Sequence, residues 1–311
     1  MNFQQLEYAI AVHKHKHFSI AAESCNVTQA TLSAMIKKME EELKVVFFDR
    51  SRKPIKTTDA GVVFVNRAKN IIKQKNELYH LYSTSTNLEG EIHLGVIPTV
   101  ASSLLAIILP TILKENPDLK LHIHEITTDE IKQELVHDKI DLGILATPLN
   151  DKRFEEDILY YEPMLLYGME DSDKNFVSSK DVQDNTIWLL EEGHCFRNQA
   201  MTICNLKEKK DKKSNLYFQA NSFETLLKLT DEFKGLTLLP ELYCNDMKPE
   251  RKQKIKPFQK PIPVREISLI HYRKHANNLS VDYLVRTIKK LMEGRLSTAN
   301  FKSSDLEIVG L

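Results

Sequence analysis

The sequence is poor in cysteine, tryptophan and glycine, and it carries no net charge. Its 311 residues include only four cysteines, one tryptophan and nine glycines, and 43 basic residues balance 43 acidic ones. Four cysteines in a chain of this length exclude a disulfide-dense scaffold. The length predicts two or three domains with ample hydrophobic core.

The sequence also lacks a long apolar run. Its most apolar segment, Leu104 to Leu113, contains Pro110 and is too short to span a bilayer. The N-terminus has no basic stretch followed by an apolar run, so no secretory signal is apparent. We therefore expect a cytoplasmic protein with no membrane partner.

The charges are distributed unevenly along the chain. Residues 1–80 contain 13 Lys or Arg and 8 Asp or Glu, a net charge of +5, so the remaining residues carry a net charge of −5. A basic head on an acidic body is typical of a chain that binds nucleic acid with one end.

The basic head has the pattern of a helix-turn-helix. Apolar spacing predicts a helix over residues 2–13, a second from an N-cap at Ser19 to Cys25, and a third capped by Thr28. The apolar stripe of the third helix is Leu32, Met35, Ile36, Met39 and Leu43. The candidate DNA contacts on its adjoining face are Gln29, Thr31, Ser33 and Lys37. From the pattern alone, an ordinary helix pair with a solvated face remains an alternative.

A β-wing and a long helix are predicted to follow. Residues 47–61 read as the wing, in which Arg50, Arg52 and Lys53 are candidate phosphate contacts. A long helix is predicted from Thr58 to about Tyr82. Its apolar side is too lightly covered for the helix to stand alone. We therefore expect it to pair with a second copy of the chain. The predicted boundaries are 1–60 for the DNA-binding domain and 61–87 for the linker, dimerisation helix and hinge.

The body of the chain, residues 88–296, alternates between strand and helix patterns. The β-α-β-α-β order over residues 90–147 predicts a parallel sheet with right-handed crossovers. Tyr161-Glu162-Pro163 marks a crossing into a second lobe. Lobe I is predicted over about 88–162 and 265–296, lobe II over about 163–264, and a tail over 297–311. The strands predicted in lobe II are 164–169, 187–190, 216–218 and 236–239, and its helix is 222–233.

Two cysteines lie in one segment of lobe II, residues 193–204. Cys195 has His194 and Arg197 within two residues. Gly193 permits a sharp turn that would place the Cys195 thiol in the first turn of a helix. Positive charge and a helix N-terminus both favour the reactive thiolate.

The spacing of these two cysteines has a geometric consequence. In a continuous helix over residues 195–204 the sulfurs would lie on opposite sides, roughly 13 Å apart along the axis. A disulfide requires Cα atoms within about 7 Å, so a bridge from Cys195 to Cys204 would force the helix to unwind. From the spacing alone, two unrelated buried thiols remain an alternative.

The string Leu189-Leu190-Glu191-Glu192-Gly193-His194-Cys195-Phe196-Arg197-Asn198-Gln199-Ala200-Met201, with Cys204 after it, closely resembles the sensing segment of the peroxide-responsive LysR-type regulators. The wing also resembles that of LysR-type proteins, because an arginine follows a phenylalanine and Thr-x-Ala-Gly begins at Thr58. The resemblance covers nearly the whole chain. It implies an N-terminal winged helix-turn-helix, a long linker helix and a two-lobed α/β regulatory domain like the periplasmic binding proteins.

The resemblance also implies site residues. Cys195 would be the peroxidatic cysteine and Cys204 the resolving cysteine of a reversible disulfide. The residues expected to line the peroxide pocket are Thr99, Thr128, His194 and Arg197. For the two threonines, a helix N-cap is the alternative role. For His194 and Arg197, it is local hydrogen bonding or surface charge.

Three positions depart from the family pattern. Lys53 stands where the family has a second arginine, and Thr57 replaces a leucine. Only Gly235 remains in a turn, residues 231–236, that has two glycines in the family. The individual wing contacts and the extent of the rearrangement on oxidation therefore do not carry over from the resemblance.

The sequence and the resemblance together predict a transcriptional regulator that senses hydrogen peroxide, and not an enzyme. The expected partners are two-fold-related double-stranded DNA, further copies of the chain in a dimer or tetramer, RNA polymerase, and a cellular thiol reductant of the thioredoxin or glutaredoxin type. No metal or cofactor is predicted. Two alternatives remain: a LysR-type regulator that binds an organic effector between its lobes, and a thiol peroxidase.

Overall fold

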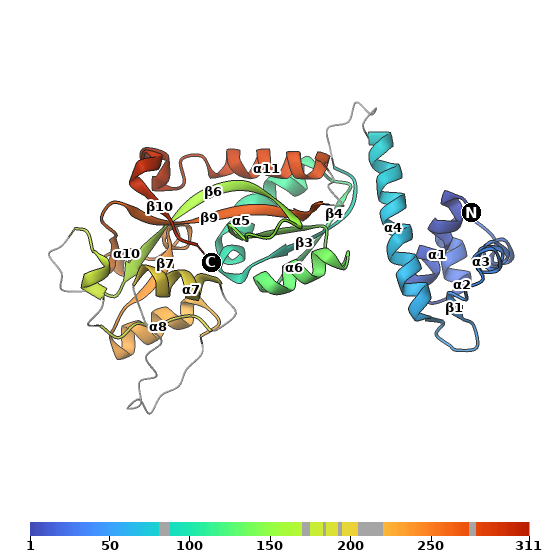
Figure 1. Cartoon of the computed structure of the whole chain (residues 1–311), viewed down its shortest axis with the longest axis horizontal. Helices are drawn as coiled ribbons and strands as arrows, with labels where there is room; N and C mark the ends of the chain where they lie inside the picture. Colours follow the sequence, from blue (N-terminus) through green and yellow to red (C-terminus); the bar gives the residue numbers. More distant parts are fainter. Residues whose placement is uncertain are drawn as a thin grey trace. The chain divides into compact units, whose positions relative to one another are not determined.

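The computed structural model describes residues 1–80, 88–169, 175–182, 185–191, 195–204, 220–273 and 278–310. The chain divides into two compact units, Met1–Thr86 and Asn87–Leu311. The first unit contains helices α1 to α4 and a two-stranded sheet, and the second contains the large mixed sheet (Figure 1).

The first unit is a winged helix-turn-helix followed by a long helix. Its elements are α1 (Phe3–His15), α2 (Phe18–Ser24), α3 (Gln29–Leu43), β1 (Phe48–Asp49), β2 (Lys56–Thr57) and α4 (Asp59–His80). Asn26 turns the chain between α2 and α3 with a positive φ of 54°. Thr28 caps α3, because its side chain accepts a hydrogen bond from Thr31 N. β1 and β2 pair in antiparallel register and form the wing.

Two predictions about these helices were wrong. The N-cap of α2 is His17 and not Ser19, whose hydroxyl instead donates to Gln29 Oε1 at 2.6 Å. Leu43 is 41% exposed, so the buried stripe of α3 ends one turn earlier, at Met39. A leucine in the last turn of α3 no longer faces the two preceding helices.

The second unit is built on one curved sheet. Its strands are β3 (Gly90–Val96), β4 (Leu119–Glu125), β5 (Leu142–Thr147), β6 (Phe154–Tyr167), β7 (Thr237–Pro240), β8 (Ile255–Pro257), β9 (Ile262–Tyr272) and β10 (Leu306–Ile308). The strand order is β4-β3-β5-β9-β6-β7, with β10 on β9 and β8 on β6. β3 pairs with β4 and β5 in parallel, as the alternating pattern predicted.

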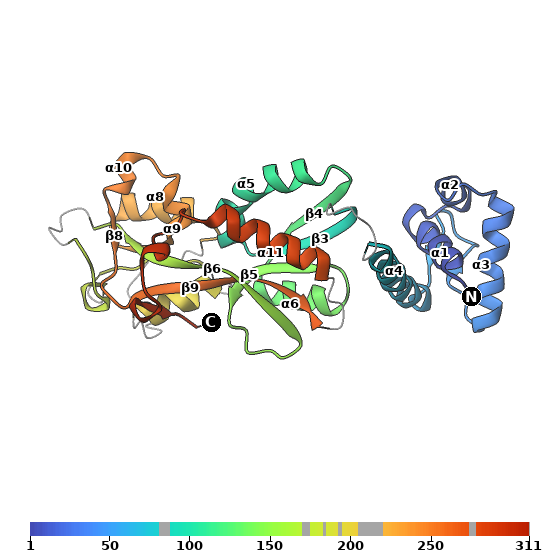
Figure 2. The ribbon, with the colours of Figure 1, turned by 90° about the horizontal axis from the view of Figure 1, so that it is seen from above.

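β6 and β9 run from one lobe to the other, as Figure 2 shows. From Phe154 to Pro163, β6 pairs with β9, and from Met164 it pairs with β7 and β8 instead. Pro163 has no amide hydrogen for a sheet ladder, so the exchange of partners occurs next to a residue that weakens pairing. These two strands make the regulatory unit two-lobed, and the predicted fold class is confirmed.

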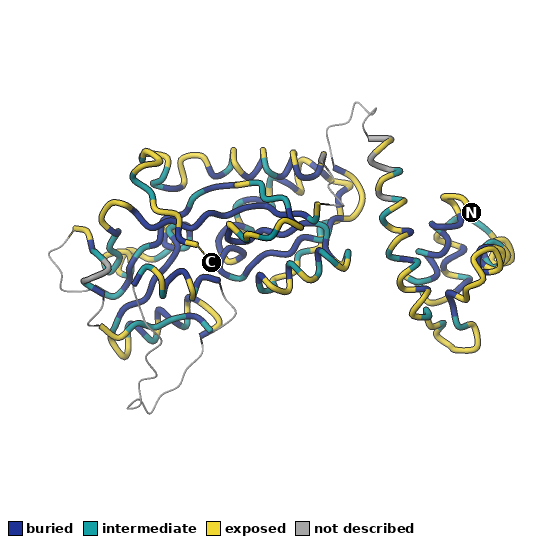
Figure 3. The backbone as a smooth tube through the Cα atoms, viewed as in Figure 1, coloured by how far each residue is buried: buried dark blue, intermediate teal, exposed yellow. Residues whose placement is uncertain are grey.

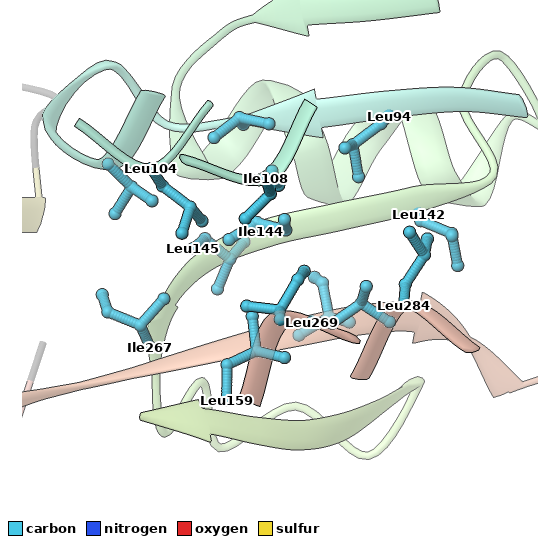
Figure 4. Packing of buried hydrophobic residues seen from close by; sticks show 14 of the residues in the cluster. Leu94, Leu104, Ile108, Leu142, Ile144, Leu145, Leu159, Ile267, Leu269 and Leu284 are labelled. Carbon is cyan, nitrogen blue, oxygen red and sulfur yellow. The ribbon is translucent and has the colours of Figure 1, made fainter. Parts of the chain in front are cut away.

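Each lobe has its own hydrophobic core. The helices of the second unit are α5 (Pro98–Glu115), α6 (Thr128–Val136), α7 (Cys195–Ile203), α8 (Phe223–Phe233), α9 (Glu241–Asn245), α10 (Pro249–Lys252) and α11 (Asn278–Met292). In lobe I, α5 and α11 bury Leu104, Ile108 and Leu284 against the sheet (Figure 4). In lobe II, α7 and α8 cover a second cluster that includes Leu226 and Leu238. Strands β5 and β9 are buried along almost their whole length, whereas the edge strand β4 has several exposed residues. Figure 3 shows the burial along the backbone.

Two expected segments turned out differently, and two others lie outside the described residues. Residues 187–190 form single bridges, Ile187 with Leu236 and Leu190 with Ala220, and not a strand. The predicted strand over 216–218 lies outside the described residues, as does the hinge over 83–87. Residues 306–308 of the expected tail form β10, which pairs with β9 in parallel.

Helix α5 has the length and hydropathy of a membrane span, and it is the one such helix among the described residues. Seven of its side chains are buried in the protein, among them Leu104, Ile108 and Ile112. Helix α5 is thus a core helix of lobe I.

Candidate functional site

Cys195 is the first residue of α7, where free backbone N–H groups and the helix dipole favour an anion. The side chain is only 9% exposed, and it packs with the core of lobe I. The next residue, Phe196, packs with the core of lobe II and meets the Phe223 ring edge-on at 5.1 Å. The thiol therefore sits where the two lobes meet.

Burial raises the pKa of the Cys195 thiol, and polar neighbours oppose that shift. The Thr128 hydroxyl lies beside the sulfur and lowers the thiol pKa most, followed by the charge of Arg265 and the first amides of α7. Thr128 Oγ1 is buried and has no hydrogen bond of regular geometry within the described part of the chain. The site thus combines burial, which disfavours the thiolate, with groups that would stabilise it.

Arg265 is the centre of a buried polar network. Its guanidinium is 1% exposed and lies 2.8 Å from Glu162 Oε2. It also donates to Thr99 Oγ1 and to the Thr99 carbonyl, each at 3.0 Å, and stacks over the Phe196 ring at 5.3 Å. Arg265 thereby connects β9, β6, α5 and α7, so it ties the two lobes together beside the thiol.

The two predicted threonines lie in this site, and neither caps a helix. The N-cap of α5 is Ile97, and that of α6 is Thr127, which forms a capping box with Glu130. Thr99 is held by Arg265, and Thr128 lies at Cys195. The N-cap alternative is therefore wrong for both residues, although their part in a peroxide pocket stays a prediction.

Arg197 and His194 are the other two residues predicted to line the pocket. Arg197 is half-buried, and its Nη1 donates to the Leu190 carbonyl at 3.1 Å. The cation that acts on Cys195 is Arg265 and not Arg197, the one predicted from the sequence. His194 and Gly193 lie outside the described residues.

Cys204 lies at the opposite end of α7 and in a different environment. Its amide donates to the Ala200 carbonyl at 3.1 Å, which continues the helical pattern beyond Ile203. The side chain is fully buried in the core of lobe II, where burial raises its pKa to about 12. Both cysteines are free thiols. The helical rise over nine residues separates the Cα atoms of Cys195 and Cys204 by roughly 13 Å along the axis.

The candidate DNA contacts lie on the surface of the first unit. Gln29, Thr31, Lys37, Arg52 and Lys53 are exposed, and Ser33 is half-buried. Arg50 also has a structural role, because its guanidinium pairs with Glu40 at 2.9 Å and lies over the Phe18 ring. Glu40 in turn accepts the amides of Phe47 and Phe48, which fixes the start of the wing.

Arg265 is the site residue that the sequence reasoning missed. Its signal was an arginine in a strand that is mostly apolar, Ile262 to Tyr272, since a buried strand carries a charge only when a partner is present. Nothing local to that strand shows that the partners would be Glu162 and Thr99, which are distant in sequence.

Comparison with known proteins identifies the family. Residues 3–62 match the bacterial regulatory helix-turn-helix family of LysR, and residues 85–293 match the LysR substrate binding domain. The chain is 35% identical over 301 residues to the DNA-binding transcriptional dual regulator OxyR of Escherichia coli K12, covering 94% of this chain and 97% of that one. It is 33% identical to the hydrogen peroxide-inducible genes activator of Pectobacterium carotovorum subsp. carotovorum, over 96% of this chain and 99% of that one.

A solved structure agrees with these relatives. A full-length OxyR variant from Pseudomonas aeruginosa superposes with a TM-score of 0.68 at 26% identity, and it covers 93% of this chain and 98% of its own. The relatives are transcription regulators and not enzymes, which excludes the thiol peroxidase alternative. The chain belongs to the LysR family of transcriptional regulators, and within that family to the OxyR subfamily.

Proposed function

We propose that this regulator senses hydrogen peroxide through Cys195 and Cys204. One observation carries the proposal: the Cys195 thiol lies at the N-terminus of α7, within the field of Arg265 and beside the buried Thr128 hydroxyl, which has no regular hydrogen bond to any described residue. Hydrogen peroxide is small, neutral and able to donate and accept hydrogen bonds. It would satisfy the Thr128 hydroxyl, which an apolar ligand would leave unpaired.

The proposed reaction consumes one peroxide and two thiols. The Cys195 thiolate attacks one peroxide oxygen, the O–O bond breaks, and hydroxide leaves and takes up the proton that the thiol gave up, forming water. Cys195 becomes a sulfenic acid. The Cys204 thiol then attacks the sulfenic sulfur, a second water leaves, and a disulfide forms. The positive field of Arg265 and the first amides of α7 would stabilise both the thiolate and the departing hydroxide.

The disulfide cannot form on intact α7. The helix holds the two cysteines too far apart, and their side chains belong to different cores. Closing the bridge would therefore unwind α7 and draw Cys204 out of lobe II, breaking contacts such as the Phe196–Phe223 pair. We propose that this rearrangement alters how copies of the regulatory unit associate, and hence the spacing of the winged heads on two-fold-related DNA.

Further partners complete the proposed cycle. A thiol reductant of the thioredoxin or glutaredoxin type would restore the dithiol by exchange. DNA-bound protein in the oxidised form would contact RNA polymerase. His194 and Arg197 are proposed to lie near the peroxide, and the exposed side chains of α3 and the wing to contact DNA.

An organic effector between the lobes is less well supported. Arg265, a buried charged group at that boundary, is already bound by Glu162 and Thr99. An anionic effector would have to compete with an ion pair in which both side chains are buried.

DNA footprinting tests the proposal. Wild-type protein should change its footprint on addition of peroxide, and the Cys195→Ser variant should keep the reduced footprint in both conditions. Cys25→Ser, which changes a thiol of the first unit, should respond like wild type. A Cys195→Ser protein with an unaltered peroxide response would contradict the proposal.

A further inference from the structure

Three imidazoles and a carboxylate lie together on one face of the edge of the sheet. His93 of β3 stands in register with His122 of β4, and their rings stack at 4.4 Å. His124 is two residues further along β4, so its side chain emerges on the same face, 5.8 Å from the His93 ring. Glu91 precedes His93 by two residues and shares that face.

The distances suit a metal ion. The ligand atoms of Glu91, His93 and His122 all lie within 4.8 Å of one another. The ligands of a tetrahedral zinc ion lie roughly 3.4 Å apart, since each bond is about 2.0–2.1 Å long. Rotation of the side chains about χ1 and χ2 is the movement that would have to close the remaining gap. Such a rotation replaces the stacking of two rings, and it leaves the backbone pairing of β3 and β4 intact.

The surroundings also suit a cation site. Glu91 contacts Lys120 across the strands at 3.8 Å, but both side chains are largely exposed, and such a pair contributes little stability. The Asp141 carboxylate accepts the His93 amide at 2.8 Å and fixes the backbone beneath the His93 ring. His93 is half-buried and His122 and His124 are exposed, so the site is open to solvent on one side.

We propose that Glu91, His93 and His122, with His124 beside them, bind a zinc-type divalent transition-metal ion. Imidazole nitrogens with one carboxylate favour zinc and its neighbours over magnesium or calcium, which prefer oxygen ligands. The ion would join β3 to β4. These strands lead directly into the segments that carry Thr99 and Thr128, so the metal would brace the part of lobe I that supports those residues.

Metal titration of the reduced full-length protein tests the site. After treatment with a chelator, the protein is titrated with Zn²⁺ in a calorimeter and with Co²⁺ in a visible spectrometer. We expect one tight site per chain, with Co²⁺ bands of tetrahedral nitrogen and oxygen ligation. His93→Ala and His122→Ala should each weaken binding by at least about 100-fold, because loss of even an outer-sphere partner costs 10–100-fold.

Two control variants test whether the metal binds at this cluster and not at other histidine or cysteine side chains. His137→Ala removes an exposed imidazole of lobe I outside the cluster, and Cys195→Ser removes the thiol at the N-terminus of α7. Both should bind the metal like wild type, and zinc should raise the Tm of both. Unchanged affinity in His93→Ala and His122→Ala would overturn the proposal. So would thiolate charge-transfer bands with Co²⁺, or loss of binding in Cys195→Ser.

Discussion

Arg265 Nη1 donates to Thr99 Oγ1 at 3.0 Å, and Nη2 of the same guanidinium donates to the Thr99 carbonyl at the same distance. The first turn of α5 is therefore fixed to the strand β9 by two bonds from one buried cation. Arg265 also pairs with Glu162 and lies over Phe196, so one buried side chain joins α5, β6 and the start of α7.

Removal of the Arg265 charge should destabilise the regulatory unit. Arg265→Gln leaves the Glu162 carboxylate buried beside a neutral group, and we expect a loss of about 3–5 kcal/mol in the free energy of unfolding. Arg197→Gln is the control, because that side chain makes one bond to a carbonyl at the edge of the same site. It should cost only about 0.5–1.5 kcal/mol. Urea denaturation measures both values, and equal losses would contradict the central role of Arg265.

The Thr128 hydroxyl should control the reactivity of Cys195. In Thr128→Val the thiolate loses its strongest stabilising neighbour, so the thiol pKa rises further. Alkylation by iodoacetamide and oxidation by peroxide should both slow on the order of tenfold. Thr127→Val, which removes the N-cap of α6, should cost about 1 kcal/mol of stability without slowing either reaction. A slower reaction only in Thr127→Val would show that helix position, and not the hydroxyl, controls the thiol.

Stability should fall in alkali. Burial raises the pKa of Cys204 and of Cys244 to about 12, from a value of 9.0 in the unfolded chain. Between pH 9 and pH 12 the unfolded thiols lose protons that the native thiols keep, so rising pH favours unfolding. Each thiol contributes at most about 1.4 kcal/mol per pH unit. Tm measured across this range should decline less steeply in Cys204→Ser and in Cys244→Ser than in wild type, and unchanged slopes would contradict this account.

Gly235, the single glycine in the turn after α8, should be required for the stability of the regulatory unit. Gly235 has φ +114°, and a Cβ there would lie 2.6 Å from the Thr186 carbonyl oxygen. We expect Gly235→Ala to cost about 1–3 kcal/mol from backbone strain, with an additional cost from the clash. Gly294→Ala is the matched control, since it has φ +73° but nothing within 4 Å of the added Cβ. Chemical denaturation should give a clearly larger loss for Gly235→Ala, and the reverse order would be inconsistent with the structure.

Much of the fold could be read from local patterns. Helical spacing predicted α1 and α3, and the alternation of strands and helices over residues 90–147 predicted the parallel half of the sheet. These features depend on periodicity and capping within one segment. The bridges at Ile187 and Leu190 could not be predicted in this way, because a short apolar run does not reveal whether neighbouring backbone is available for a ladder.

The site was less predictable, because it is formed by residues distant in sequence. The helix at Cys195 and the positions of Thr99 and Thr128 at helix starts followed from the sequence and the resemblance. The identity of the cation near Cys195 did not follow from either of them. Arg197 is two residues from Cys195, but its side chain turns to the Leu190 carbonyl. The charge of Arg265 acts on Cys195 because β9 crosses between the lobes.

Peptide mapping of the full-length protein after addition of one equivalent of peroxide tests the sensing mechanism most directly. The account predicts that the peptides of Cys195 and Cys204 become linked with the loss of two hydrogens, while Cys25 and Cys244 remain available for alkylation after denaturation. Retention of Cys204 as a free thiol beside a stably oxidised Cys195, or a bridge from Cys195 to Cys244, would contradict it.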